Sequence, residues 1–218
     1  MSIFVKATEE GYVLQKPGYV AVAMMLVALV VIAAFVAGKK ESSKMTTKQL
    51  VFCGMAIALA TVTSMLKYSF PFGGSVTLCS MLFICLVGYV YGPVTGIMTG
   101  LSYGLLQFLI EPYMLFPTQV ILDYLLAFGA LGLSGFFWKS KHGLVKGYLL
   151  GICGRYLFSV ISGCVFFGAY AWEGWSVLPY SLAYNGAYIF TEGIITILVL
   201  AIPAAARAFE QVKVNARN

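Results

Sequence analysis

Seven apolar stretches, each close to the length that a helix needs to cross a bilayer, constrain this chain more than any other feature. About 20 residues span a hydrocarbon core of roughly 30 Å. The stretches lie near residues 17–38, 49–66, 77–92, 93–110, 117–138, 145–170 and 181–205. The uncharged run 68–110 is too long for one span, so we expect a break at Gly92-Pro93, where proline cannot continue the hydrogen-bond ladder. The pattern predicts an all-α polytopic membrane protein.

Composition leaves little sequence for a soluble domain. Only 10% of the 218 residues are charged, whereas soluble domains have about 25%. A polar linker at 39–49 separates the first apolar stretch from the rest, so we divide the chain into residues 1–48 and a six-helix membrane domain, 49–218. The first stretch could also be a signal peptide, but its length and the lysines that follow it favour a retained transmembrane helix.

The basic residues gather in alternate connections between the apolar stretches. Ten lie on one side: Lys39, Lys40, Lys44, Lys48, Lys139, Lys141, Lys146, Arg207, Lys213 and Arg217. The other side has three: Lys6, Lys16 and Lys67. Cytoplasmic loops are rich in Lys and Arg, so we expect a cell-membrane protein with its N-terminus outside and its C-terminus in the cytoplasm. The net charge of +6 is explained by this bias, and a nucleic-acid partner is not expected.

Motifs for common catalytic chemistry are missing from the sequence. It has no GxxxxGK[ST] phosphate loop and no HExxH, and its single histidine, His142, lies in a basic loop. The five cysteines show no CxxC spacing, which argues against a metal site or a disulfide framework. With Asp123 as the one aspartate, paired catalytic aspartates are also excluded. We expect neither an enzyme nor a cofactor.

Several polar residues nevertheless fall inside apolar stretches. Asp123 is one, and an ionised carboxylate near a bilayer centre costs at least about 3 kcal/mol. Arg155 lies at a similar depth in the next stretch, so the two could form an ion pair, with or without a ligand at Asp123. Asn185 lies among Tyr180, Tyr184 and Tyr188 in the last stretch. Glu192 is a second intramembrane carboxylate, to which we give less weight as a ligand contact.

The outer connections are rich in aromatic residues, in the segments 67–77, 111–118 and 171–181. Such residues often anchor a protein at the membrane surface. Three aromatic loops on one face could equally cover a pocket for a flat aromatic ligand. Composition does not decide between these two alternatives.

Five motifs in order resemble the ThiT (YuaJ) family, the thiamine-specific S components of energy-coupling factor transporters. They are FGGSVTL (72–78), GLSYGLLQFL (100–109), DYLLAFGALGLSG (123–135), GRYLFSVISGCVFFGAYA (154–171) and YSLAYNGAY (180–188). The resemblance covers roughly residues 50–200. It implies a six-helix S-component bundle, here with one extra N-terminal transmembrane helix. It also implies thiamine uptake with a transmembrane coupling subunit and two ATPase subunits as partners.

The resemblance also implies contact residues. Asp123 and Tyr124 match a carboxylate and tyrosine that hold the ligand, Tyr180 and Asn185 match contacts in the last helix, and Arg155 matches a basic residue near the carboxylate. At three positions this chain departs from the family: Asp123 replaces the usual glutamate, Ser159 a histidine and Phe167 a tryptophan. We still expect hydrogen bonding from Ser159 and an aromatic face from Phe167.

These departures leave alternatives open. The ligand could be thiamine, one of its precursors such as the pyrimidine or thiazole half, or a related heterocycle. Trp172 or Trp175 could restore the lost stacking from a loop. From another functional class, a membrane scaffold without a small ligand would use the buried polar groups for packing alone.

The first helix of the S-component family has small residues that slide against the coupling subunit. Ala56 and Ala60 have the i, i+4 spacing that close helix approach needs. The resemblance therefore predicts a partner interface at these two residues. Packing inside the bundle is the alternative.

Overall fold

The computed structural model describes residues 5–8, 11–21, 24, 45–70 and 74–217. The predicted first transmembrane helix, 17–38, lies largely outside these residues, although 16–21 are helical. The division of the chain at residue 48 stays a prediction. The helices and strands are β1 (Val5–Thr8), β2 (Gly11–Leu14), α2 (Thr47–Met65), β3 (Lys67–Ser69), β4 (Ser75–Thr77), α3 (Ser80–Tyr91), α4 (Pro93–Ile110), α5 (Pro117–Val120), the π-helix η2 (Ile121–Leu126), α6 (Ala127–Ala130), η3 (Leu131–Phe137), α7 (Gly143–Phe166), η4 (Gly168–Tyr170), α8 (Val177–Ala201) and α9 (Pro203–Arg217).

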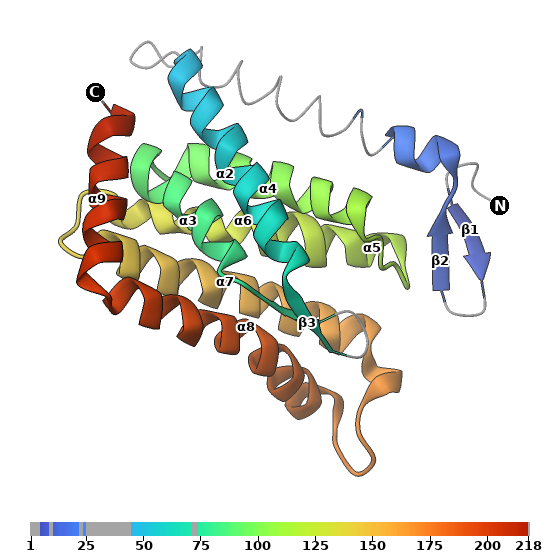
Figure 1. The fold of residues 1–218 in the computed structure, drawn as a ribbon. Coiled ribbons are helices and arrows are strands. Elements are labelled where there is room, and N and C mark those ends of the chain that lie inside the picture. Colours follow the sequence, from blue (N-terminus) through green and yellow to red (C-terminus); the bar gives the residue numbers. More distant parts are fainter. Residues whose placement is uncertain (1–4, 9–10, 22–23, 25–44, 71–73, 218) are drawn as a thin grey trace.

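The prediction of an all-α polytopic membrane protein is confirmed. In the described residues, α2, α4, α7, α8 and the continuous span 117–137 are long and apolar enough to cross a membrane. The sixth apolar helix, α3, has 12 residues and is almost entirely buried. It packs against α2, α4, α7 and η3, and so forms the centre of the bundle (Figure 1). The predicted break lies at Gly92, whose φ of +94° favours glycine, with Pro93 opening α4.

Glycines allow the span 117–137 to pack closely against α4. A Cβ at Gly104 would lie 1.9 Å from the carbonyl oxygen of Tyr124, and one at Gly132 would lie 2.0 Å from the backbone nitrogen of Ile97. Only glycine permits this approach of two backbones, as small residues do between membrane helices generally. Most of the interior glycines are packing features of this kind, because a Cβ at them would meet a neighbouring element. Their contact fixes the depth of Tyr124 and of its neighbour Asp123.

Helix α3 starts later than the predicted residue 77. A hairpin precedes it, in which β3 and β4 pair antiparallel with Lys67 opposite Thr77. Cys79 then takes a left-handed conformation, with φ of +57°. The buried Glu192 of α8 accepts the Met81 N–H (3.0 Å) at the start of α3. The helix boundary therefore depends on a tertiary contact that periodicity does not show.

The last predicted helix, 181–205, is two helices. Helix α8 ends at Ala201 because Ile202 is extended (ψ of +119°), as the residue before a proline usually is. Helix α9 then turns across the end of the bundle (Figure 1). Its Lys213 Nζ donates to the Trp138 carbonyl (2.7 Å), and the Tyr91 hydroxyl donates to the Ala216 carbonyl (3.1 Å). This is the end opposite the hairpin.

The predicted partner interface at Ala56 and Ala60 is wrong. Ala56 is 5% exposed and Ala60 is fully buried, in clusters with residues of α3. The Tyr103 hydroxyl also donates to the Ala60 carbonyl (3.3 Å). Both alanines therefore serve close packing inside the bundle. The exposed face of α2 instead has Gly54 and Ala58, which share the i, i+4 spacing.

Candidate ligand-binding site

A cavity of about 320 Å³ opens at the end of the bundle that carries the β3–β4 hairpin. Its wall is formed by the hairpin, the loop 111–116, the span 117–137, α7 and α8. All of the predicted contact residues line it: Asp123, Tyr124, Arg155, Ser159, Phe167, Tyr180 and Asn185. Residues separated by more than 60 positions in the sequence thus meet around one space of a size typical for small ligands.

The side chain of Asp123 lines this cavity. It lies in the π-helix η2, a helical form that is rare and common at functional sites. Its Oδ2 accepts a hydrogen bond from Gln119 Nε2 (2.8 Å). No hydrogen bond to Oδ1 meets ordinary geometry within the described part of the chain, although the hydroxyl of the buried Ser162 lies near the same carboxylate. The half-buried carboxylate thus retains an acceptor for a ligand.

The predicted ion pair between Asp123 and Arg155 does not form. The ion pair among the described residues joins Lys67 to Glu111 at the cavity rim. Arg155 instead stacks its guanidinium over the ring of Phe128, 4.3 Å from the centroid. Both charged side chains line the cavity, but the partner of Asp123 is the amide of Gln119 and the partner of Arg155 is the ring of Phe128.

The hydroxyl of Tyr124 is already engaged by the protein. It accepts from the Tyr113 N–H (3.1 Å) and donates to the Glu111 carbonyl (3.0 Å). Its ring packs edge-on against Phe108, with centroids 5.0 Å apart. A ligand would therefore meet the ring of Tyr124 rather than its hydroxyl.

Asn185 is held by a short network at the base of the cavity. Its Nδ2 donates to the Ser181 carbonyl (2.9 Å), and its Oδ1 accepts from the Tyr188 hydroxyl (2.6 Å). The Ser181 hydroxyl in turn donates to the Val160 carbonyl of α7 (2.9 Å). These bonds fix the orientation of the amide. The neighbouring Ser159 is 6% exposed and lines the same wall.

Aromatic rings form the rest of the wall. Phe167, at the end of α7, stacks nearly parallel to Tyr113 with centroids 6.1 Å apart and an 18° angle between planes. Tyr180 stacks on Tyr184 at 5.7 Å. Burial raises the pKa of Tyr113 to about 12, so its phenol stays neutral and can donate a hydrogen bond. Described residues of the aromatic segments 67–77 and 111–118 do line a pocket, which favours the second of the two alternatives left by the sequence.

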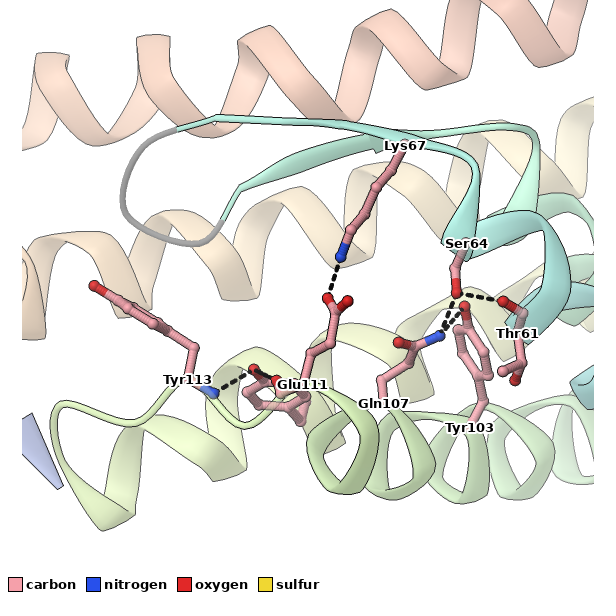
Figure 2. Close-up of polar contacts among 8 residues, drawn as sticks. Thr61, Ser64, Lys67, Tyr103, Gln107, Glu111 and Tyr113 are labelled. Carbon is pink, nitrogen blue, oxygen red and sulfur yellow. Dashed lines mark hydrogen bonds and ion pairs between the residues drawn. The ribbon is translucent and has the colours of Figure 1, made fainter. Parts of the chain in front are cut away.

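Sequence reasoning missed several residues at the rim, which Figure 2 shows. Besides the Lys67–Glu111 pair, Gln107 Nε2 donates to the hydroxyls of Ser64 (2.9 Å) and Tyr103 (2.6 Å). A polar residue inside an apolar segment is a sequence signal for a functional position, and Gln107 is such a residue. Trp172 and Trp175 do not line the cavity; Trp172 touches it only through an edge contact to Tyr180 (5.2 Å).

Comparison with known proteins decides the family. Residues 50–210 match the family model described as "Thiamine transporter protein (Thia_YuaJ)". This chain belongs to that family. The thiamine transporter ThiT of Bacillus subtilis (strain 168) is 36% identical over 161 residues, which are 67% of this chain and 83% of the relative. ThiT of Lacticaseibacillus paracasei is 33% identical over 128 residues, 53% of this chain and 60% of the relative.

A solved structure of a family member has the same fold. The structure of ThiT from Listeria monocytogenes aligns with a TM-score of 0.61 and 28% identity, covering 72% of this chain and 96% of that one. The resemblance inferred from the five motifs is therefore confirmed. Membership in a transporter family fits a substrate-binding membrane protein without catalytic chemistry of its own.

Proposed function

We propose that this protein captures thiamine in the cavity beneath the β3–β4 hairpin, as the substrate-binding subunit of a vitamin importer. The observation that supports this most is the convergence of Asp123, Phe167 and Asn185, from three separate helices, on one aromatic-lined space. The chain belongs to a family described as thiamine transporters, and its relatives in two bacteria bear that name.

The chemistry of thiamine suits this space. Its thiazolium is a permanent cation, which a carboxylate and aromatic faces attract. Its aminopyrimidine is flat and has hydrogen-bonding edges. Asp123 would meet the cation or the amino group, Phe167 and Tyr124 would cover the ring faces, and Ser159, Tyr180 and Asn185 would hydrogen-bond the polar edges.

We propose that the cavity faces the outside of the cell. It opens at the end of the bundle that bears Lys67, whereas Lys48, Trp138 and the basic helix α9 meet at the other end, where Lys48 Nζ donates to the Asn215 carbonyl. The basic end would be cytoplasmic by the positive-inside rule. The C-terminus would then lie in the cytoplasm and the N-terminus outside.

Import against a concentration gradient needs a source of energy. This sequence has no phosphate loop with which to bind and hydrolyse ATP. We propose a transmembrane coupling subunit and two ATPase subunits as partners. The exposed face of α2 is a suitable contact, because Gly54 and Ala58 leave it shallow and a Cβ at Gly54 would meet nothing within 4 Å. Leucine at both positions should reduce thiamine uptake by cells without weakening binding to the purified protein.

Calorimetric titration of the detergent-solubilised protein with thiamine, and then with its pyrimidine and thiazole halves, tests the proposal. Tight binding of thiamine would mean that Asp123, Ser159 and Phe167 are tolerated replacements. Tight binding of one half alone would indicate a precursor importer. No binding of any of the three would support the scaffold alternative.

A further inference from the structure

Gln119 lies one helical turn before Asp123 and is only 1% exposed. Its side chain makes contacts in two directions. Nε2 donates to Asp123 Oδ2 (2.8 Å) and to the Tyr113 carbonyl (3.5 Å), whereas Oε1 accepts from the Leu115 N–H (2.8 Å) and the Phe116 N–H (3.5 Å). Sequence reasoning did not single out this residue, although the i, i+4 spacing to Asp123 was visible.

The two contacts fix which end of the amide faces Asp123. The backbone N–H groups of Leu115 and Phe116 can only donate, so the carbonyl oxygen of Gln119 must face them. The NH₂ group therefore faces the carboxylate. A carboxylate acceptor strengthens this bond relative to one between neutral groups.

The consequence for Asp123 is an asymmetric carboxylate. One oxygen is bonded to Gln119, and the other makes no hydrogen bond among the described residues and remains for a ligand in the cavity, with the buried hydroxyl of Ser162 as its nearby protein neighbour. Gln119 also lines that cavity. Because its Oε1 is tied to the loop that carries Tyr113, it connects the carboxylate to the stacked pair of Tyr113 and Phe167.

We propose that Gln119 is a positioning residue that sets which oxygen of Asp123 meets the ligand. The inference rests on the proposed function, since its effect is read through thiamine binding. The alternative is that Gln119 only caps the short helix α5, where it occupies the third position and accepts the N-cap N–H. Capping would affect folding, whereas positioning would act through Asp123.

A double-mutant cycle in thiamine affinity separates these roles. The variants are Gln119→Met, Asp123→Asn and the two combined, each titrated calorimetrically with thiamine. We expect Gln119→Met to weaken binding on the order of tenfold, as for residues of one hydrogen-bond network. In the Asp123→Asn background the same change should have almost no further effect. Equal losses in both backgrounds would overturn the proposal, because a cap acts independently of residue 123.

Gln49→Met is the matched control. Gln49 also donates to a side chain, the Thr95 hydroxyl (2.9 Å), but it lies at the start of α2, away from the cavity. We expect its thiamine affinity to equal that of the wild type. A wild type that binds no thiamine would contradict the proposed function itself, whereas a binding wild type with an unaffected Gln119→Met would contradict only the role of Gln119.

If Gln119→Met does not fold, a second double variant, Gln119→Glu with Asp123→Asn, tests the same proposal. Glutamate still caps α5, and the asparagine amide can donate to it, so one carboxylate, one amide and their hydrogen bond remain. Their positions are exchanged, and the one hydrogen bond lost is the long one from residue 119 to the Tyr113 carbonyl (3.5 Å). We expect affinity as low as that of Asp123→Asn alone, and wild-type affinity would overturn the proposal.

Discussion

The Glu192 carboxylate of α8 accepts a 2.6 Å hydrogen bond from the hydroxyl of Thr77, the last residue of β4. Its two oxygens also receive the N–H groups of Thr77 (3.3 Å) and Met81 (3.0 Å), and all of these partners are donors. At 2% exposure, Glu192 is thus the buried anchor between α8 and the hairpin that borders the cavity.

Glu192→Gln should destabilise the protein although it keeps the side-chain volume. The new NH₂ group must face a backbone N–H, of Thr77 or of Met81, which loses its acceptor. A buried group left unsatisfied costs about 1–3 kcal/mol. Thermal melting in detergent should show a lower midpoint. The control, Glu210→Gln, alters an exposed carboxylate bonded to the Tyr89 hydroxyl and should change the midpoint less; equal shifts would contradict the anchoring role.

Asp123→Asn should weaken thiamine binding by roughly 10- to 150-fold, the range for hydrogen bonds to charged groups. Asparagine can still accept from Gln119, so the fold should persist. A neutral isostere of thiamine, with carbon in place of the thiazolium nitrogen, shows which group Asp123 meets. If Asp123→Asn reduces affinity for the isostere less than affinity for thiamine, Asp123 meets the cation. If both affinities fall equally, Asp123 meets the amino group. Unchanged affinity for both ligands would exclude Asp123 from the site.

Gly74→Ala should lower thiamine affinity, because the added Cβ would lie 2.7 Å from the ring of Tyr188 and 2.9 Å from the hydroxyl of Tyr184. Both tyrosines line the cavity. Gly54→Ala is the matched control, since its Cβ meets nothing within 4 Å. Titration of the two variants with thiamine should separate them clearly, and identical affinities would show that the hairpin does not shape the cavity.

Phe167→Ala should weaken thiamine binding by roughly 2- to 12-fold, the worth of an aromatic pair beyond simple burial. It also removes the partner on which Tyr113 stacks. Phe167→Trp retains a ring and should bind at least as tightly as the wild type. Calorimetry on the three proteins checks the order, and an alanine variant as tight as the tryptophan one would refute stacking at this position.

The apolar runs were sufficient to predict the five helices of the described residues that are long enough to cross a membrane, because a bilayer tolerates a backbone only when a helix satisfies all of its hydrogen bonds. The break at Gly92-Pro93 was predictable for the same local reason. Asp123 and Asn185 stood out in the sequence as polar residues within apolar segments, where burying a polar side chain costs free energy. The motifs then led to the family, and every expected contact residue lies at one cavity.

Periodicity could not assign partners to these polar groups. Arg155 and Asp123 have opposite charges at similar depth, and yet Phe128 and Gln119 are their neighbours. Likewise, Ala56 and Ala60 have the spacing of an interface, but rotation of α2 about its axis turns them toward α3 and leaves Gly54 and Ala58 exposed. Spacing defines which residues share a face, whereas packing decides where that face points.

The sequence by itself determined that the chain is a helical membrane protein of this family and which polar residues are costly enough to need a purpose. Only the tertiary structure decided that Gln119 donates to Asp123, that Glu192 anchors the hairpin and that α3 begins at Ser80. The physical reason is that hydrophobicity is a property of each segment alone, whereas a hydrogen bond in the interior depends on distances of a few tenths of an ångström between segments far apart in the chain.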